Sequence, residues 1–215
     1  MYKGSLEENG FVVYDDILEK DDFIRINNYL KKVFNDKSKW STLIKYSNDI
    51  YRRSYIESSD IKKISKNIIE DKSKFNYIYH KLDDSKYIIE IIQELVLKKW
   101  AEFFDIEDFK EFNFSITSFT NGCFLDWHND SNDDKTFNKD YKYTILLYFG
   151  ENKVHNINEK LQFSYKGIES LIDPIPNRSV LFIPNKESMH RVSSLQSSIS
   201  NNECFDRIAF SGWLI

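Results

Sequence analysis

Two short stretches of this chain carry side chains of the types that bind metal ions. In the first, Phe124–Asp130, one residue separates His128 from Asp130, and in the second, Ser188–Val192, the candidate is His190. Side chains alternate across a strand, so residues at i and i+2 share a face. Two imidazoles and one carboxylate leave the remaining positions of a metal open, which suits non-haem Fe(II) better than a closed structural zinc site. The sequence therefore predicts a metal centre made by His128, Asp130 and His190.

A candidate anion-binding residue follows near the end of the chain. Arg207 is followed at once by Ile208, Ala209 and Phe210, a pattern that predicts a buried strand. A buried guanidinium is costly unless it meets an anion, and its planar fork fits a carboxylate. An ion pair with Asp206 at the surface is the competing interpretation.

In this order, the His-x-Asp pair, the distal His and the Arg resemble the Fe(II)/2-oxoglutarate-dependent dioxygenases, especially their prolyl 4-hydroxylase-like branch. The resemblance is close over the C-terminal half of the chain and extends to the first half only in general layout. It implies an α+β fold with a double-stranded β-helix (jelly-roll or cupin-like) core and buttressing N-terminal helices. We expect one domain over residues 1–215, with a helix-rich N-terminal layer at 1–110 and the barrel with the metal site at 111–215.

The resemblance also implies roles for single residues. The three metal ligands would be the catalytic residues, and Arg207 would hold the distal carboxylate of 2-oxoglutarate. Tyr148 matches a family tyrosine whose hydroxyl contacts the same carboxylate, and a plain core tyrosine is the alternative. The residues expected to bind the co-substrate or line its pocket are Tyr148, Val192, Arg207, Ser211 and Trp213.

Two positions depart from the pattern of the family. Many relatives carry a tyrosine that hydrogen-bonds the co-substrate where this chain has Phe119, whose ring has no hydroxyl. Relatives also tend to have two glycines before the strand that starts here at Leu161, and this chain has Asn158, Glu159 and Lys160. The first departure bears on the contacts of the co-substrate, and the second on the shape of a loop.

The activity that the resemblance implies is an oxidation. Fe(II), 2-oxoglutarate and O2 would be required, with ascorbate as a further candidate cofactor, and succinate and CO2 would be released. The substrate would be a C–H of an amino-acid, peptidyl (prolyl-type) or related small molecule. Asp130 favours hydroxylation, because family members that halogenate lack this acid. The alternative is a non-catalytic metal- or ligand-binding β-barrel that serves as a sensor or scaffold.

Composition limits the partners. The chain has 215 residues, a net charge of −4 and a pI of about 5.7, so a nucleic acid is not expected as a partner. Nucleic-acid demethylases of the superfamily also usually carry a second Arg where this chain has Trp213.

No apolar stretch approaches the roughly 18 residues of a membrane span, and the start of the chain resembles no signal peptide. Cys123 and Cys204 suggest neither a disulfide framework nor a metal site, so we expect a cytoplasmic enzyme acting on a small-molecule, peptide or protein substrate, in an oligomeric state that the sequence leaves open.

Hydrophobic periodicity predicts the elements that must position these residues. Helical spacing is strongest over 85–104, and weaker helices are expected at 20–34 and 61–69. Residues 131–141 form a polar connection, either a lid or a solvated loop. Strands are expected at 10–14, 75–79, 112–119, 124–130, 143–149, 161–165, 178–183, 190–192 and 207–214.

Overall fold

The computed structural model describes residues 2–34, 40–46, 73–80, 86–104, 106, 112–119, 124–131, 141–151, 159–193 and 207–214. The expected helix at 61–69 and most of the connection at 131–141 lie outside these residues. The same holds for Cys123, Cys204, His155 and Asp206.

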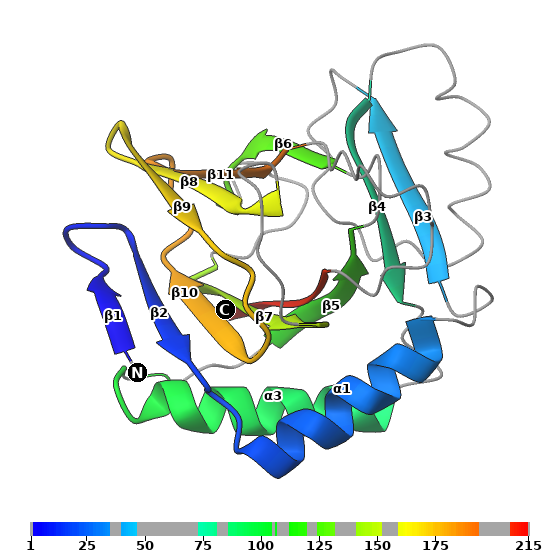
Figure 1. Cartoon of the computed structure of the whole chain (residues 1–215). Helices are drawn as coiled ribbons and strands as arrows, with labels where there is room; N and C mark the ends of the chain where they lie inside the picture. Colours follow the sequence, from blue (N-terminus) through cyan, green and yellow to red (C-terminus); the bar gives the residue numbers. More distant parts are fainter. Residues whose placement is uncertain are drawn as a thin grey trace.

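Two antiparallel sheets face each other and enclose the core (Figure 1). The major sheet has the order β1 (Tyr2–Ser5), β2 (Phe11–Asp15), β10 (Arg178–Phe182), β7 (Tyr143–Phe149), β12 (Ile208–Leu214) and β5 (Phe112–Ser118). The minor sheet has the order β6 (Phe124–His128), β11 (Ser188–Val192), β8 (Leu161–Tyr165) and β9 (Ile168–Ile172). Strand β4 (Ser73–His80) pairs with β5 and with β6 and so joins the sheets on one side, where β3 (Trp40–Tyr46) pairs with it. This is the expected double-stranded β-helix.

Two helices, α1 (Lys20–Phe34) and α3 (Lys86–Ala101), lie along the outer face of the major sheet (Figure 1). Helix α1 carries acidic residues in its first turn and basic residues in its last, and charges in this order interact favourably with the helix dipole. The indole N–H of Trp100 on α3 donates to Ser179 Oγ at 3.0 Å, and this hydroxyl donates to the carbonyl of Leu146 at 2.7 Å. The helix is thus anchored to two strands of the sheet through a buried hydrogen-bonded chain.

Strand alternation divides the major sheet into two faces. On β7, Ile145, Leu147 and Phe149 pack with the helices, and Leu146 and Tyr148 pack into the barrel. Strand β12 follows the same rule: its helix-side residues are Ile208, Phe210 and Leu214, and Ala209 lies on the barrel side. The sheet therefore separates a helix-side core from a barrel core, and the candidate site residues of β7 and β12 belong to the barrel side.

The first 110 residues contribute more strand than the expected helix-rich layer. Strands β1 to β4 come from this part of the chain, and two of them extend the major sheet beyond β10. Strands β1, β3 and β9 were not predicted; β9, for example, has a mostly exposed pattern with no clear apolar alternation. None of the described helices is both long and apolar enough to cross a membrane.

Candidate metal centre

The pairing of β6 with β11 brings the two candidate histidines together. His190 lies opposite His128, and Val192 lies opposite Leu125, so the interval on β6 is one residue longer than that on β11. This β-bulge lets both Leu125 and His128 face the barrel, as bulges near functional sites commonly do. The two imidazole rings have their centroids 4.0 Å apart.

Asp130 reaches the histidines by a different route from the one expected. Strand β6 ends at His128, so continued strand alternation does not place the carboxylate. Instead, Asn129 Oδ1 accepts hydrogen bonds from the main-chain N–H of Ser131 at 3.1 Å and from its hydroxyl at 2.5 Å. This local side-chain turn follows the strand and leaves the Asp130 carboxylate in the barrel, where the residue is 4% exposed.

The three side chains offer one ligand atom each within 4.8 Å of one another. Asp130 Oδ1 lies 3.6 Å from His128 Nε2, and Asp130 Oδ2 lies 3.8 Å from His190 Nε2. The donors are two nitrogens and one oxygen on one side of a shared point, a set that suits Fe(II) with open positions. The residues present therefore fit the metal that the sequence predicts.

Neighbouring groups fix the orientation of both imidazoles. His128 Nδ1–H donates to the carbonyl of Asp126 at 2.8 Å, which leaves Nε2 as the nitrogen with a lone pair for a metal. His190 is 3% exposed, and the rings of Phe163 and Phe182 lie 6.3 Å and 4.9 Å from its ring centroid. The first imidazole is thus oriented by a hydrogen bond and the second by aromatic packing.

The carboxylate of Asp130 receives two hydrogen bonds from the opposite sheet. Trp213 Nε1–H donates to Oδ2 at 3.0 Å, and the Thr144 hydroxyl donates to the same oxygen at 3.1 Å. Trp213 was expected to line the co-substrate pocket, and its indole N–H instead contacts a candidate metal ligand. Thr144 was missed by the sequence reasoning, although a threonine inside the apolar run Tyr143–Phe149 was a usable signal.

Arg207 lies just before β12 and is 4% exposed. Its Nη1 donates to the main-chain carbonyl of Glu159 at 2.6 Å. Its guanidinium carbon lies 5.3 Å from the ring centroid of Phe119 and 5.6 Å from that of Tyr148. Phe119 thus stands beside the guanidinium and offers it an aromatic face.

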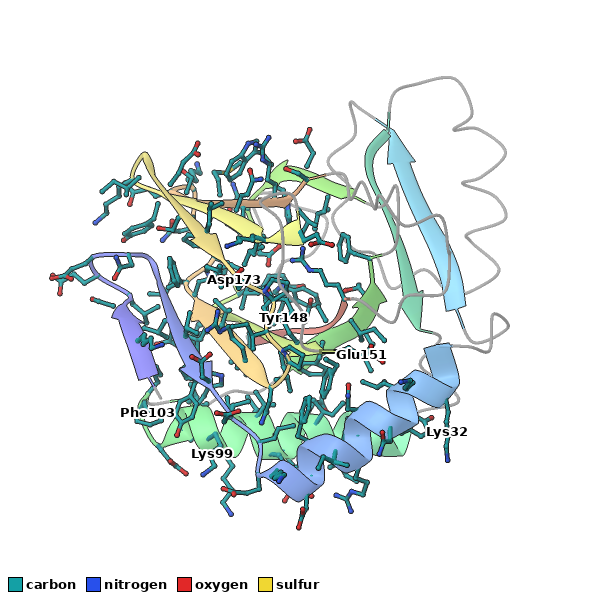
Figure 2. The ribbon with its side chains drawn as sticks, in the orientation of Figure 1. Lys32, Lys99, Phe103, Tyr148, Glu151 and Asp173 are labelled. Carbon is teal, nitrogen blue, oxygen red and sulfur yellow. The ribbon has the colours of Figure 1, made fainter. Side chains whose placement is uncertain are left out.

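Two buried polar atoms in this pocket lack a hydrogen-bond partner within the described part of the chain, Tyr148 Oη and Arg207 Nε. Burial raises the pKa of Tyr148, and the nearby Arg207 charge offsets this only in part, so the hydroxyl keeps its proton. Burial lowers the pKa of Arg207, against the opposing influence of Tyr148 and Glu159. A carboxylate that reached both atoms would satisfy them, which is the role expected of Arg207 and Tyr148 toward the distal end of 2-oxoglutarate. Figure 2 shows Tyr148 inside the barrel, between the two sheets.

The remaining predicted pocket residues lie on both sheets of the barrel. Val192 belongs to the barrel core, and Ser211, 4% exposed, lies on β12 two residues from Ala209 and two from Trp213. The Glu159 carbonyl could not be found from the sequence, because a main-chain acceptor has no side-chain signature. His80 is the last residue of β4.

Comparison with known proteins places this geometry in a family. Residues 114–215 match the model of the 2OG-Fe(II) oxygenase superfamily. No curated protein shows significant sequence similarity to the chain.

Solved structures share the fold at low sequence identity. A prolyl-4-hydroxylase from Pseudomonas putida aligns with a TM-score of 0.59 and 13% identity, over 97% of this chain and 94% of that one. A prolyl hydroxylase from Trichoplax adhaerens, in complex with a hypoxia inducible factor oxygen degradation domain peptide fragment, aligns with a TM-score of 0.61 and 14% identity, over 98% and 85%. A 2OG-Fe(II) oxygenase family oxidoreductase from Burkholderia pseudomallei aligns with a TM-score of 0.56 and 9% identity, over 97% and 86%.

The matched segment, residues 114–215, includes the three candidate metal ligands and Arg207. The family match and the group His128, Asp130 and His190 support an oxygenase that uses Fe(II), 2-oxoglutarate and O2.

Proposed function

We propose that this enzyme hydroxylates a C–H bond of an amino-acid residue in a peptide, with a prolyl-type residue as the leading candidate. The observation that carries the proposal is the group His128, Asp130 and His190, whose ligand atoms lie within 4.8 Å of one another inside the barrel. In this proposal these three residues hold Fe(II), which, when bound, supplies the activation of O2 that removes CO2 from 2-oxoglutarate and leaves succinate.

The co-substrate pocket supports the same reaction class. Arg207 and Tyr148 would bind the distal carboxylate, the arginine through its charged N–H groups and the tyrosine through a hydroxyl that stays protonated. Both belong to the major sheet or its immediate end, and the histidines belong to the minor sheet. A molecule that spans the barrel from Arg207 to the metal would therefore be held at both ends and shielded from water.

Two fold relatives support the substrate class. The Trichoplax adhaerens structure contains a peptide fragment, and the Pseudomonas putida protein is a prolyl-4-hydroxylase. Their likeness to this chain is one of fold, so the substrate is the part of the proposal that needs direct assay. Free amino acids and related small molecules belong in the same screen.

The decisive experiment measures succinate formed from 2-oxoglutarate by purified protein with Fe(II) and O2. We expect slow succinate release without a second substrate, and no release from His128→Ala under the same conditions. Release that survives this substitution, or its complete absence from the wild type with every peptide tested, would contradict the proposed activity.

A mass-spectrometric screen identifies the substrate. Incubation with prolyl peptides, other peptides and free amino acids should give one product class that gains a single oxygen atom, and His128→Ala should give none. A binding protein without catalysis would bind the metal and 2-oxoglutarate and yield neither product.

A further inference from the structure

The carboxylate of Asp130 has two different oxygens. Oδ2 accepts hydrogen bonds from Trp213 Nε1 at 3.0 Å and from Thr144 Oγ1 at 3.1 Å. Oδ1 lies 3.6 Å from Nε2 of His128, the nitrogen that its Asp126 hydrogen bond leaves for a metal. The two donors on Oδ2 restrict the direction of the carboxylate, with Oδ1 facing His128 Nε2 and Oδ2 lying 3.8 Å from His190 Nε2.

The two donors are neighbours on the opposite sheet. Trp213 on β12 and Thr144 on β7 are directly paired across the strands, whereas both histidines lie on the minor sheet. Asp130 follows the end of β6 and has no strand ladder of its own to hold it. The paired donors are therefore the contacts that position the one ligand lying outside regular structure.

We propose that Trp213 and Thr144 are positioning residues that make Asp130 a one-oxygen ligand and so preserve open positions on the metal. This inference rests on the proposed function. A carboxylate released from these donors could rotate and offer both oxygens, which would raise the coordination number and occupy a position needed by 2-oxoglutarate or O2.

Strand β12 also connects this metal-ligand contact with the residue expected to bind the co-substrate. Arg207 lies just before the strand, and Trp213 lies near its far end. The strand and the residue just before it thus carry a candidate group for the distal carboxylate of the co-substrate and a group that contacts a candidate metal ligand. Loss of the Trp213 hydrogen bond should alter the metal site while leaving the Arg207 end in place.

The variants Trp213→Phe and Thr144→Val each remove one donor and keep a similar shape. The chain offers matched controls. Trp100→Phe removes another buried indole N–H, which donates to Ser179 at 3.0 Å on the helix side, and Thr117→Val removes another buried hydroxyl, which donates to the Ala209 carbonyl at 3.2 Å.

The experiment titrates each protein with Co(II) under anaerobic conditions and records both the dissociation constant and the visible absorption spectrum of the bound ion. We expect Trp213→Phe to weaken Co(II) binding by about 10-fold and to change the band intensities that report coordination number, as the loss of an outer partner of a ligand commonly does. Thr144→Val should do the same to a smaller degree. Both control variants should retain the wild-type constant and spectrum.

The outcomes separate this inference from the proposed function. If wild-type protein binds no Co(II), or His128→Ala binds it equally well, the metal site itself is wrong. If wild type binds and Trp213→Phe gives the same constant and spectrum, or Trp100→Phe weakens binding as much, the positioning role is overturned. Should Trp213→Phe fail to fold, the comparison of Thr144→Val with Thr117→Val decides by the same criteria.

Discussion

The two faces of the major sheet differ in how their buried polar groups are hydrogen-bonded. On the helix side, the described cluster is apolar, and the indole of Trp100 is satisfied by Ser179. On the barrel side, the same strands carry Thr144, Tyr148, Ser211 and the adjacent Arg207, all buried. The polar atoms Tyr148 Oη and Arg207 Nε have no hydrogen-bond partner within the described residues. Among the described residues, the helix side is completed by the protein itself, whereas the barrel side leaves two polar atoms that a carboxylate could satisfy.

Two arginines, Arg178 partly buried and Arg207 buried, show the same contrast. Arg178 on β10 forms a two-pronged ion pair with Asp15, through Nε at 2.5 Å and Nη2 at 3.1 Å. Arg207 instead donates to a main-chain carbonyl. One guanidinium is therefore matched by a carboxylate of the chain, and the other is paired, among the described residues, with a main-chain carbonyl.

The largest effect is expected on the helix side. Phe210→Ala removes a fully buried ring and should lower the free energy of unfolding by about 4 kcal/mol, since large-to-small core changes lose transfer energy and leave a cavity. Urea unfolding measures this loss. The dissociation constant of 2-oxoglutarate, measured on folded protein, should stay close to wild type; a large rise would show that the two faces are not separate.

The second largest effect is expected from the replacement of Arg207, which pairs with no carboxylate in the part of the chain that the structure describes. Arg207→Met should weaken 2-oxoglutarate binding by at least about 100-fold, roughly 3 kcal/mol, because two charge-assisted bonds are lost. Isothermal titration with Mn(II) in place of Fe(II) measures it. Arg178→Met is the matched control: it should destabilise the fold and leave the binding constant unchanged, and equal losses of affinity in both variants would refute the contrast.

The Asp15–Arg178 pair predicts a pH effect on stability. Partial burial acts to raise the pKa of Asp15, but hydrogen bonds and charge from Arg178, with help from Lys3, outweigh it, so the pKa lies below its usual value. A carboxyl whose pKa is lowered by folding contributes its stabilisation above the usual pKa and loses it as the pH falls toward the folded value.

Asp15→Asn should therefore cost about 2 kcal/mol near neutral pH, the worth of hydrogen bonds to a charged group, and this cost should shrink below about pH 4. Unfolding by urea at several pH values gives both numbers. A cost that stays constant down to acid pH would mean that the pair contributes nothing through its charge.

The smallest effect has opposite signs in stability and binding. Tyr148→Phe removes a buried hydroxyl without a hydrogen-bond partner in the described chain, so ligand-free stability should hold or rise by up to about 1 kcal/mol, while 2-oxoglutarate binds about 5-fold to 10-fold more weakly. Thermal unfolding with and without the co-substrate measures both. Tighter binding by the variant would show that Tyr148 is a core residue without a role in co-substrate binding.

Much of the barrel was predictable because its strands are buried in a regular way. The expected strands at 143–149 and 161–165 and the helix at 20–34 agree with the structure at both ends. The strand predicted to continue to Asp130 ends at His128, because a bulge and the Asn129 turn take over where the ladder stops. Periodicity describes a repeating backbone, so it cannot report the point where the repeat is broken.

For the candidate site, the sequence allowed the residue types to be proposed but not their hydrogen-bond partners. The histidines, Asp130 and Arg207 could be proposed from side-chain chemistry and order along the chain, and Tyr148 from the resemblance to a family. The contacts of Trp213 and Thr144 with Asp130, and of the Glu159 carbonyl with Arg207, could not. Each joins segments far apart in the sequence, and one uses only the main chain.

The sequence by itself determined which groups are available for metal and anion binding, and which strands must be buried to hold them, because side-chain chemistry and hydrophobic spacing are local properties. Only the tertiary structure decided that Asp130 is held from the opposite sheet and that Arg207 stands between two aromatic rings. Those facts depend on sheet pairing and on the bulge in β6, which bring distant residues to within hydrogen-bonding distance.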